Sequence, residues 1–199
     1  KHVRSSRVTW FGCACCPPNV ARILTSLEKY SYDISDDSNS IAIHLYLCGQ
    51  IIMSDDSVWN ITGKYLTDGK IEITYSGEER DFTLRLRNPG WSTACEIRIN
   101  GLRIKAESEQ GYFYILRKWK NGDTVQLKFG ITAQLVYANT YVEDDAGKVA
   151  VMRGPVVFCL EEADNGKNLS ELMIGTIESH CENSVILNGY REHTMDSIP

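Results

Sequence analysis

The stretch KIEITYSGEERDFTLRLR, residues 70–87, predicts the fold of this 199-residue chain. On both sides of a turn at Gly77, apolar side chains alternate with polar ones: Ile71, Ile73 and Tyr75, and then Phe82, Leu84 and Leu86. Alternation with period two is typical of a strand that buries one face. Similar short runs occur from residue 41 to residue 129, separated by turn signals and not by helices. This spacing indicates a mostly β protein built as an antiparallel, jelly-roll-like β-sandwich.

The dipeptide Asn100-Gly101 is the strongest turn signal in the chain. It separates the runs 97–99 and 102–104, whose apolar residues face each other across it. Asn and Gly accept the positive φ that a two-residue hairpin turn requires. We therefore expect a β-hairpin there.

The only convincing helix lies before the strands. Apolar residues at positions 20, 23, 24, 27 and 30 have the spacing of one helical face, and Pro18 suits a first helical turn. We expect a helix from about 18 to 30. A single helix cannot bury its own apolar face, so this stripe must pack on other residues.

Composition excludes several classes of protein. A hydrophobic fraction of 43% with 24% charged residues indicates a folded chain, and the net charge of −5 gives no reason to expect nucleic acid or an anionic membrane as a partner. No apolar run is long enough to span a bilayer. The first residues, KHVRSSR, are too polar for a signal peptide and lack a Met, so we expect the chain to begin inside a longer protein.

Three cysteines, Cys13, Cys15 and Cys16, lie directly before Pro17 and the expected helix. A helix N-terminus favours a thiolate, which is the form that attacks carbon and binds metal. From the residues alone, three interpretations stay open: a metal site, a reactive thiol without metal, or inert thiols. The spacing is not that of paired Cys-x-x-Cys zinc knuckles, and this stretch offers at most three ligands. A thiol redox protein is disfavoured because no thioredoxin-like βαβ pattern surrounds the cysteines.

The other four cysteines are scattered through strand-like runs, and we expect them to be small core residues: Cys48, Cys95, Cys159 and Cys181.

Four stretches carry a resemblance to a known family. They are WFGCACCPPNVAR (10–22), LRLRNPGWS (84–92), NGD (121–123) and VMRGPVV (151–157). Their order and spacing resemble glycoside hydrolase family 127, the β-L-arabinofuranosidases, along roughly the first 160 residues. The cysteine motif is the specific one, whereas the later stretches are ordinary turns that gain weight from their order.

The resemblance implies a domain organisation. In that family a long (α/α)6 barrel precedes β-sandwich domains, and the expected helix would be the last helix of the barrel. Residues 1–30 would then end the helical catalytic barrel, 31–136 would form a β-sandwich, and 137–199 would form part of a second one. The main partner of the chain would be the missing N-terminal barrel.

The resemblance also implies roles for individual residues. Cys15 would be both the nucleophile and a zinc ligand, and Cys16 a second zinc ligand. A glutamate and a further cysteine would complete the zinc site from upstream, where the acid/base glutamate also lies, so the chain alone should be inactive. The substrate would be a carbohydrate, an arabinofuranoside. The protein would be bacterial, and its compartment, cytoplasmic or periplasmic, stays open. The role of Cys13 stays open.

Two weaker expectations accompany this interpretation. Trp10 and Phe11, beside the thiols, could stack on a sugar ring, although plain core packing is the competing role for both. The alternative function is a non-catalytic, carbohydrate-associated β-sandwich module.

Overall fold

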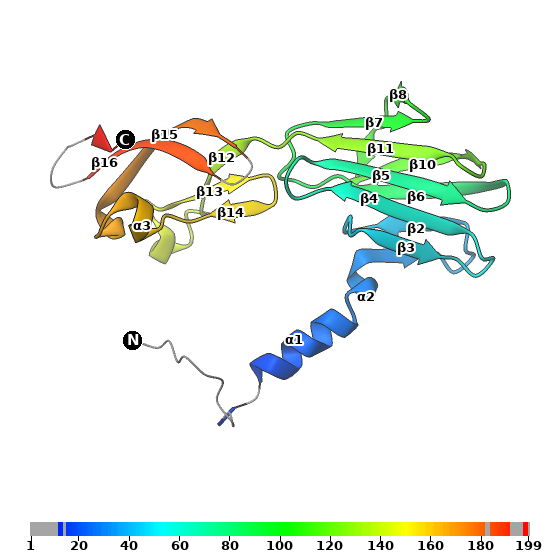
Figure 1. Ribbon diagram of the computed structural model, residues 1–199, viewed down its shortest axis with the longest axis horizontal. Coiled ribbons are helices and arrows are strands. Elements are labelled where there is room, and N and C mark those ends of the chain that lie inside the picture. Colours follow the sequence, from blue (N-terminus) through cyan, green and yellow to red (C-terminus); the bar gives the residue numbers. More distant parts are fainter. Residues whose placement is uncertain (1–11, 14, 182–183, 192–196, 199) are drawn as a thin grey trace.

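The computed structural model describes residues 12–13, 15–181, 184–191 and 197–198. Two helices come first, α1 (Cys16–Thr25) and α2 (Glu28–Ser31), and nearly all that follows is strand. Figure 1 shows α1 projecting from the end of the sandwich at which α2 joins β1. The structure confirms a mostly β fold preceded by one main helix.

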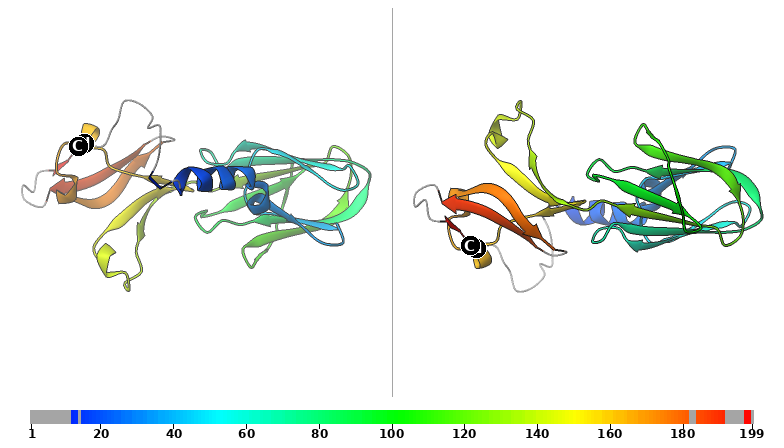
Figure 2. Two further views of the ribbon diagram at one scale, coloured as in Figure 1. Left: turned by 90° about the horizontal axis from the view of Figure 1, so that it is seen from below. Right: turned by 90° about the horizontal axis from the view of Figure 1, so that it is seen from above.

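Two sheets stack to form the sandwich, as the two views in Figure 2 show. Sheet A has the strand order β1-β2-β6-β10-β9, with bounds β1 (Tyr32–Ile34), β2 (Ser40–Ile43), β6 (Arg80–Arg87), β9 (Ser108–Glu109) and β10 (Tyr112–Trp119). Sheet B has the order β3-β4-β5-β11-β7-β8, with bounds β3 (Gly49–Ile52), β4 (Val58–Lys64), β5 (Lys70–Ser76), β7 (Cys95–Ile99), β8 (Leu102–Ile104) and β11 (Thr124–Phe129). All of these pairings are antiparallel except β2 with β6, which is parallel.

The alternation seen in the sequence sets the core. In β5 and β6 the apolar residues are buried between the sheets and the intervening polar ones are not. Trp59 is fully buried at the centre, where its ring lies 4.8 Å from that of Tyr75 and 5.0 Å from that of Trp119. The indole nitrogen of Trp119 donates to the carbonyl of Phe82 at 2.9 Å, which satisfies its polar atom inside the core.

The expected hairpin is present. Asn100 and Gly101 both have positive φ, and the register pairs Ile97 with Ile104 and Ile99 with Leu102. Asp123, which is only 8% exposed, accepts a hydrogen bond from the Asn100 side chain at 2.7 Å. The hairpin is thereby fixed to the turn that precedes β11.

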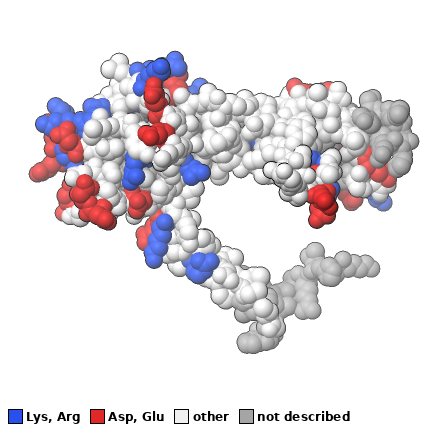
Figure 3. Space-filling model, turned by 180° about the vertical axis from the view of Figure 1, so that it is seen from behind, with Lys and Arg blue, Asp and Glu red and all other residues white. Residues whose placement is uncertain are grey.

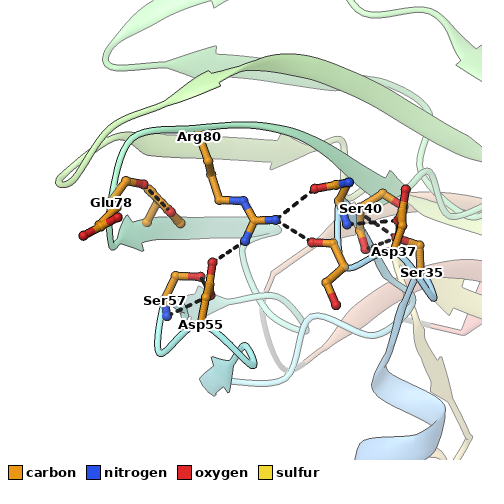
Figure 4. A network of polar contacts seen from close by, with 10 residues as sticks. Ser35, Asp37, Ser40, Asp55, Ser57, Glu78 and Arg80 are labelled. Atoms are coloured by element: carbon orange, nitrogen blue, oxygen red, sulfur yellow. Dashed lines mark hydrogen bonds and ion pairs between the residues drawn. The ribbon is translucent and has the colours of Figure 1, made fainter.

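A second polar network ties the start of β6 to two loops (Figure 4). Arg80 forms an ion pair with Asp55 and donates to the backbone oxygen of Ser38 at 2.6 Å. The Asp55 carboxylate also accepts from the Ser57 hydroxyl at 2.6 Å, and this bond is the main cause of the lowered pKa of Asp55. One guanidinium group therefore joins the loop before β2 to the turn between β3 and β4.

The rest of the chain forms two small antiparallel sheets, of order β12-β13-β14 and β15-β16-β17. Their elements are β12 (Ala133–Tyr137), η1 (Glu143–Asp145), β13 (Val149–Arg153), β14 (Val156–Phe158), α3 (Glu162–Asn165), η2 (Leu169–Glu171), β15 (Leu172–His180), β16 (Val185–Arg191) and β17 (Ser197–Ile198). Hydrogen bonds from Arg153 to the Thr67 carbonyl at 3.1 Å and from Gln134 to the Trp91 carbonyl at 3.4 Å join the first of these sheets to the sandwich. Among the helices of the described residues, none has the length and apolar character needed to cross a membrane.

Two expectations need correction. The expected helix at 18–30 begins earlier, at Cys16, and is interrupted after Thr25. The hydroxyls of Thr25 and Ser26 donate to helical carbonyl oxygens of the preceding turn, those of Ala21 at 3.1 Å and Arg22 at 2.6 Å, and these bonds compete with the backbone hydrogen bonds where α1 ends.

The scattered cysteines are also not all core residues. Cys48, Cys159 and Cys181 are exposed, and only Cys95 is partly buried. The three exposed cysteines lie just outside strands, in connecting segments, where period-two burial no longer applies.

Candidate active site

The thiol pair stands at the first turn of α1. Cys15 is the N-cap residue, Cys16 opens the helix, and two prolines follow in the first turn, where their missing N–H groups leave no carbonyl unpaired. The two Sγ atoms lie 3.5 Å apart, and both side chains are exposed. The fold thus places two adjacent thiols side by side at one helix end.

Asn19 holds the backbone of the thiol pair. Its side-chain amide donates to the carbonyl oxygen of Cys15 at 2.7 Å, and its backbone N–H reaches the same oxygen at 3.3 Å. The side-chain oxygen of Asn19 in turn accepts from Arg22 Nε at 3.3 Å. Sequence reasoning missed this clamp, although its signal was present, since Asn19 and Arg22 follow Cys15 at helical spacings of four and seven.

The pair can supply part of a zinc site. Two thiolates on one tetrahedral zinc ion, each about 2.3 Å from the metal, lie about 3.8 Å apart, so a separation of 3.5 Å fits two ligand positions with a small adjustment. Within the described residues, no group of three His, Cys, Asp or Glu side chains is placed to hold a metal. Cys15 and Cys16 therefore fit zinc as two ligands of four, and Cys13, which is exposed, lies nearby in sequence.

The helix that carries the thiols has an apolar face without a partner among the described residues. None of the residues of α1 is buried, and Val20 and Leu24 are 57% and 67% exposed. On the face seen in Figure 3, few charged groups lie on this helix, whereas charges of both signs are mixed over the sandwich. Such a surface is typical of an element that packs against another part of a protein.

Ser31 attaches the helical segment to the sandwich. Its carbonyl oxygen accepts two backbone hydrogen bonds, from His44 at 2.8 Å and from Leu45 at 3.1 Å. Its hydroxyl donates to the carbonyl of Leu27 at 2.8 Å, and the residue is 7% exposed. The end of α2 is therefore bonded to the segment that leaves β2.

The structure places one further histidine, His44, in the segment after β2, but not the two aromatic candidates. Trp10 and Phe11 fall outside the described residues. His44 is in contact with Tyr112, its Nδ1 lying 2.7 Å from the phenol oxygen. Burial lowers the pKa of His44, and neighbouring arginines act in the same direction, against the opposing effect of Asp33. His44 is thus a structural residue of the sandwich.

Comparison with known proteins gives consistent matches along the chain. Residues 40–131 match the model of the β-L-arabinofuranosidase GH127 middle domain, and residues 133–199 match that of the glycoside hydrolase family 127 C-terminal domain. A non-reducing end β-L-arabinofuranosidase of Bifidobacterium longum subsp. longum is 36% identical over 84% of this chain, which spans only 26% of that relative.

Solved structures agree. The crystal structure of a GH127 β-L-arabinofuranosidase from Geobacillus stearothermophilus T6 matches with a TM-score of 0.79 and 38% identity, over 94% of this chain and 32% of that one. A second GH127 β-arabinofuranosidase matches with a TM-score of 0.75 and 34% identity, over 83% of this chain and 29% of that one.

Proposed function

Because the chain belongs to glycoside hydrolase family 127, we propose that it is the C-terminal part of a retaining glycosidase that acts on β-L-arabinofuranosides. The names of the relatives support this substrate class, since the Bifidobacterium and Geobacillus relatives are both called β-L-arabinofuranosidases. The observation that carries the proposal within this chain is the pair of Sγ atoms 3.5 Å apart at the start of α1.

In this mechanism Cys15 is the nucleophile. Its thiolate attacks the anomeric carbon, the glycosidic C–O bond breaks, and an acid protonates the departing oxygen. Water then attacks the carbon of the resulting glycosyl–sulfur bond and gives its proton to the same acid/base group, and Cys15 returns to the thiolate. Asn19 fixes the Cys15 backbone through its carbonyl oxygen.

Cys15 and Cys16 would hold a zinc ion, and a bound zinc ion keeps a coordinating thiol deprotonated. The remaining zinc ligands and the acid/base glutamate would come from upstream of this chain. Protonation of the departing oxygen would depend on that upstream glutamate, so the 199-residue chain alone is expected to be inactive.

The exposed apolar face of α1 supports the placement of this helix as the last helix of an upstream (α/α)6 barrel. On that basis residues 1–30 end the catalytic barrel, 31–136 form the sandwich, and 137–199 belong to a second sandwich. The chain spans about a quarter of its curated relative, which leaves ample length for a barrel.

The competing function is a non-catalytic module associated with carbohydrate. The continuous hydrophobic core of the sandwich favours this function, because such a core explains the stability of the domain without any catalytic role. In that case the thiol pair would have no role in turnover.

Hydrolysis of an aryl β-L-arabinofuranoside separates these functions. We expect turnover by the chain extended upstream to its natural start, and none by its Cys15→Ser variant or by the 199-residue chain. A Cys159→Ser variant of the extended protein is the matched control, because Cys159 is an exposed thiol far from α1 in sequence. Full activity of the Cys15→Ser protein would show that this thiol is not the nucleophile. Absence of turnover in every protein would favour the module.

A further inference from the structure

A groove of about 870 Å³ opens where the helical segment meets the sandwich. We call it the α2 groove. It is formed by three segments, 44–48, 63–67 and 87–91, together with Tyr30 of α2 and Pro155. The apolar and aromatic side chains that line it include Leu45, Leu47, Tyr65, Leu66 and Trp91. Leu66 is 56% exposed, and Leu45 and Leu47 are also exposed. Exposed leucines gathered in one hollow are typical of a surface that another protein segment covers.

The apolar surface of the groove continues onto the helices. A second hollow, of about 200 Å³, lies beside the α2 groove and shares Leu45 and Leu47 with it, and its other lining residues include Leu27. Leu27 is part of the apolar stripe that runs along α1, and Tyr30 joins that stripe to the α2 groove. One continuous apolar surface therefore extends from the thiol-bearing helix to the loops of the sandwich.

Two cationic side chains line the groove. Neither Lys64 nor Arg87 forms an ion pair with any residue that the structure describes. A group that fills the α2 groove would bring carboxylates opposite them, since a covered cation needs a partner. The exposed leucines disfavour a sugar as occupant, because hydroxyl groups would lose water there without gaining hydrogen bonds.

We propose that the α2 groove is the docking site for the part of the same protein that lies upstream of residue 1, and that this segment presents an apolar face with an acidic residue opposite Arg87. The proposal rests on the proposed function in so far as the chain is part of a longer family 127 protein. Three observations select this occupant: the groove is continuous with the uncovered face of α1, its charge is cationic, and the chain spans only 26% to 32% of its relatives. The segment would cover the sandwich loops as well as α1.

Hydrogen–deuterium exchange tests the docking without any need for catalysis. Backbone amides of 44–48 and 63–67 should exchange about tenfold or more slowly in the upstream-extended protein than in the 199-residue chain. The amides of the Asn100–Gly101 turn, which lies away from the groove, should exchange equally in both. Equal exchange of the groove amides in the two proteins would overturn the proposal.

Paired substitutions test the residues. Leu66→Asp should lower the melting temperature of the extended protein and leave that of the 199-residue chain unchanged, because Leu66 is already exposed in the latter. Leu116→Asp, at a leucine 74% exposed on the outer face of sheet A, should affect neither protein. Arg87→Glu should lower the melting temperature of the extended protein, whereas Arg103→Glu, at an exposed arginine without an ion pair among the described residues, should not. A Leu66→Asp effect no larger than that of Leu116→Asp would refute the assignment.

Other occupants have their own signatures. Protection of the groove amides in the 199-residue chain by arabino-oligosaccharides would make the groove a sugar site, and protection that increases with protein concentration would make it a contact between copies. Either result, with unchanged exchange in the extended protein, contradicts the docking. A failure to hydrolyse the arabinofuranoside would leave the exchange result standing, so the two proposals fail independently.

Discussion

Asp123 is predicted to be the most important charged residue for the stability of the sandwich. Its carboxylate accepts hydrogen bonds from the Asn100 side chain at 2.7 Å and from the Lys120 backbone at 3.0 Å. It also lies 3.3 Å from a guanidinium nitrogen of Arg117. Because the carboxylate is almost entirely buried, water cannot replace these partners when it is removed.

The magnitude follows from these contacts. A hydrogen bond to a charged acceptor contributes about 1.5 kcal/mol or more, and a partly exposed ion pair less than about 1 kcal/mol. Asp123→Ala should therefore lower the free energy of unfolding by about 3 kcal/mol. Asp123→Asn keeps one acceptor oxygen and should lower it by about half as much.

Urea denaturation of the 199-residue chain at pH 7, followed by tryptophan fluorescence, measures both values. Asp81→Ala is the control, because Asp81 is exposed and its side chain makes no hydrogen bond within the described residues, so its effect should stay within about 0.5 kcal/mol. If Asp123→Ala costs no more than Asp81→Ala, the carboxylate does not stabilise the hairpin as argued.

The pH dependence provides a second check on Asp123. Burial raises its pKa, but the hydrogen bonds from Asn100 and Lys120 and the charge of Arg117 outweigh burial, so the pKa is lowered in the folded state. The unfolded state then binds a proton more readily, and the stabilisation is fully present above the ordinary carboxyl pKa of about 3.9 and is lost as the pH falls through the lower folded value. The difference between the wild type and Asp123→Asn should therefore shrink below about pH 4.

The remaining predictions concern a thiol and two glycines. Burial raises the pKa of the Cys95 thiol to about 12, so iodoacetamide at pH 8 should label Cys95 last among the cysteines, and mass spectrometry of a time course would contradict this if the exposed thiols reacted no faster. Gly101→Ala should cost about 1–2 kcal/mol, because its positive φ of 80° is strained for alanine while no heavy atom lies near the new methyl group. Gly69→Ala should cost more, since at a similar φ of 70° the methyl group would also lie 2.6 Å from the carbonyl oxygen of Phe129. If urea denaturation gave the same loss of stability for Gly69→Ala and Gly101→Ala, the contact with the Phe129 carbonyl would be relieved by a small shift at little cost.

The β-sandwich was predictable because local patterns agree with the tertiary structure. The alternation in 70–87 places the buried faces of β5 and β6, and the Asn100-Gly101 signal places the hairpin with its register. In these segments turn chemistry and burial indicate the same structure.

The segments that sequence reasoning missed have irregular periodicity. The nine-residue strand β15 (Leu172–His180) shows two register shifts against β16, so its apolar residues do not keep a period of two. The early end of α1 depends on hydroxyl groups bonding to helical carbonyls, which helical spacing alone does not reveal.

The candidate site was predictable in part. Adjacent cysteines before two prolines indicated a pair of thiols at a helix start, and the structure places the Sγ atoms 3.5 Å apart there. The clamp of Asn19 and Arg22 was not recognised, because an asparagine and an arginine in a helix are usually solvent-facing. Among the described residues, no third His, Cys, Asp or Glu side chain is placed with the two thiols to hold a metal ion.

The attachment of the helices at Ser31 makes them a lever. Sixteen residues separate Ser31 from Cys15, which at a helical rise of 1.5 Å per residue is a reach of at most about 24 Å, because the helix is interrupted after Thr25. A tilt of about 5° at this pivot would displace the Cys15 sulfur by up to about 2 Å. If Cys15 is the proposed nucleophile, a misplacement of 1 Å would lower its rate about a hundredfold. The hydrogen bonds of Ser31 fix one end of the helical segment. The position of the Cys15 sulfur at the other end depends on contacts along the whole length of the helices. Substitutions in the sandwich loops near this pivot are therefore expected to change turnover at a thiol that they never touch.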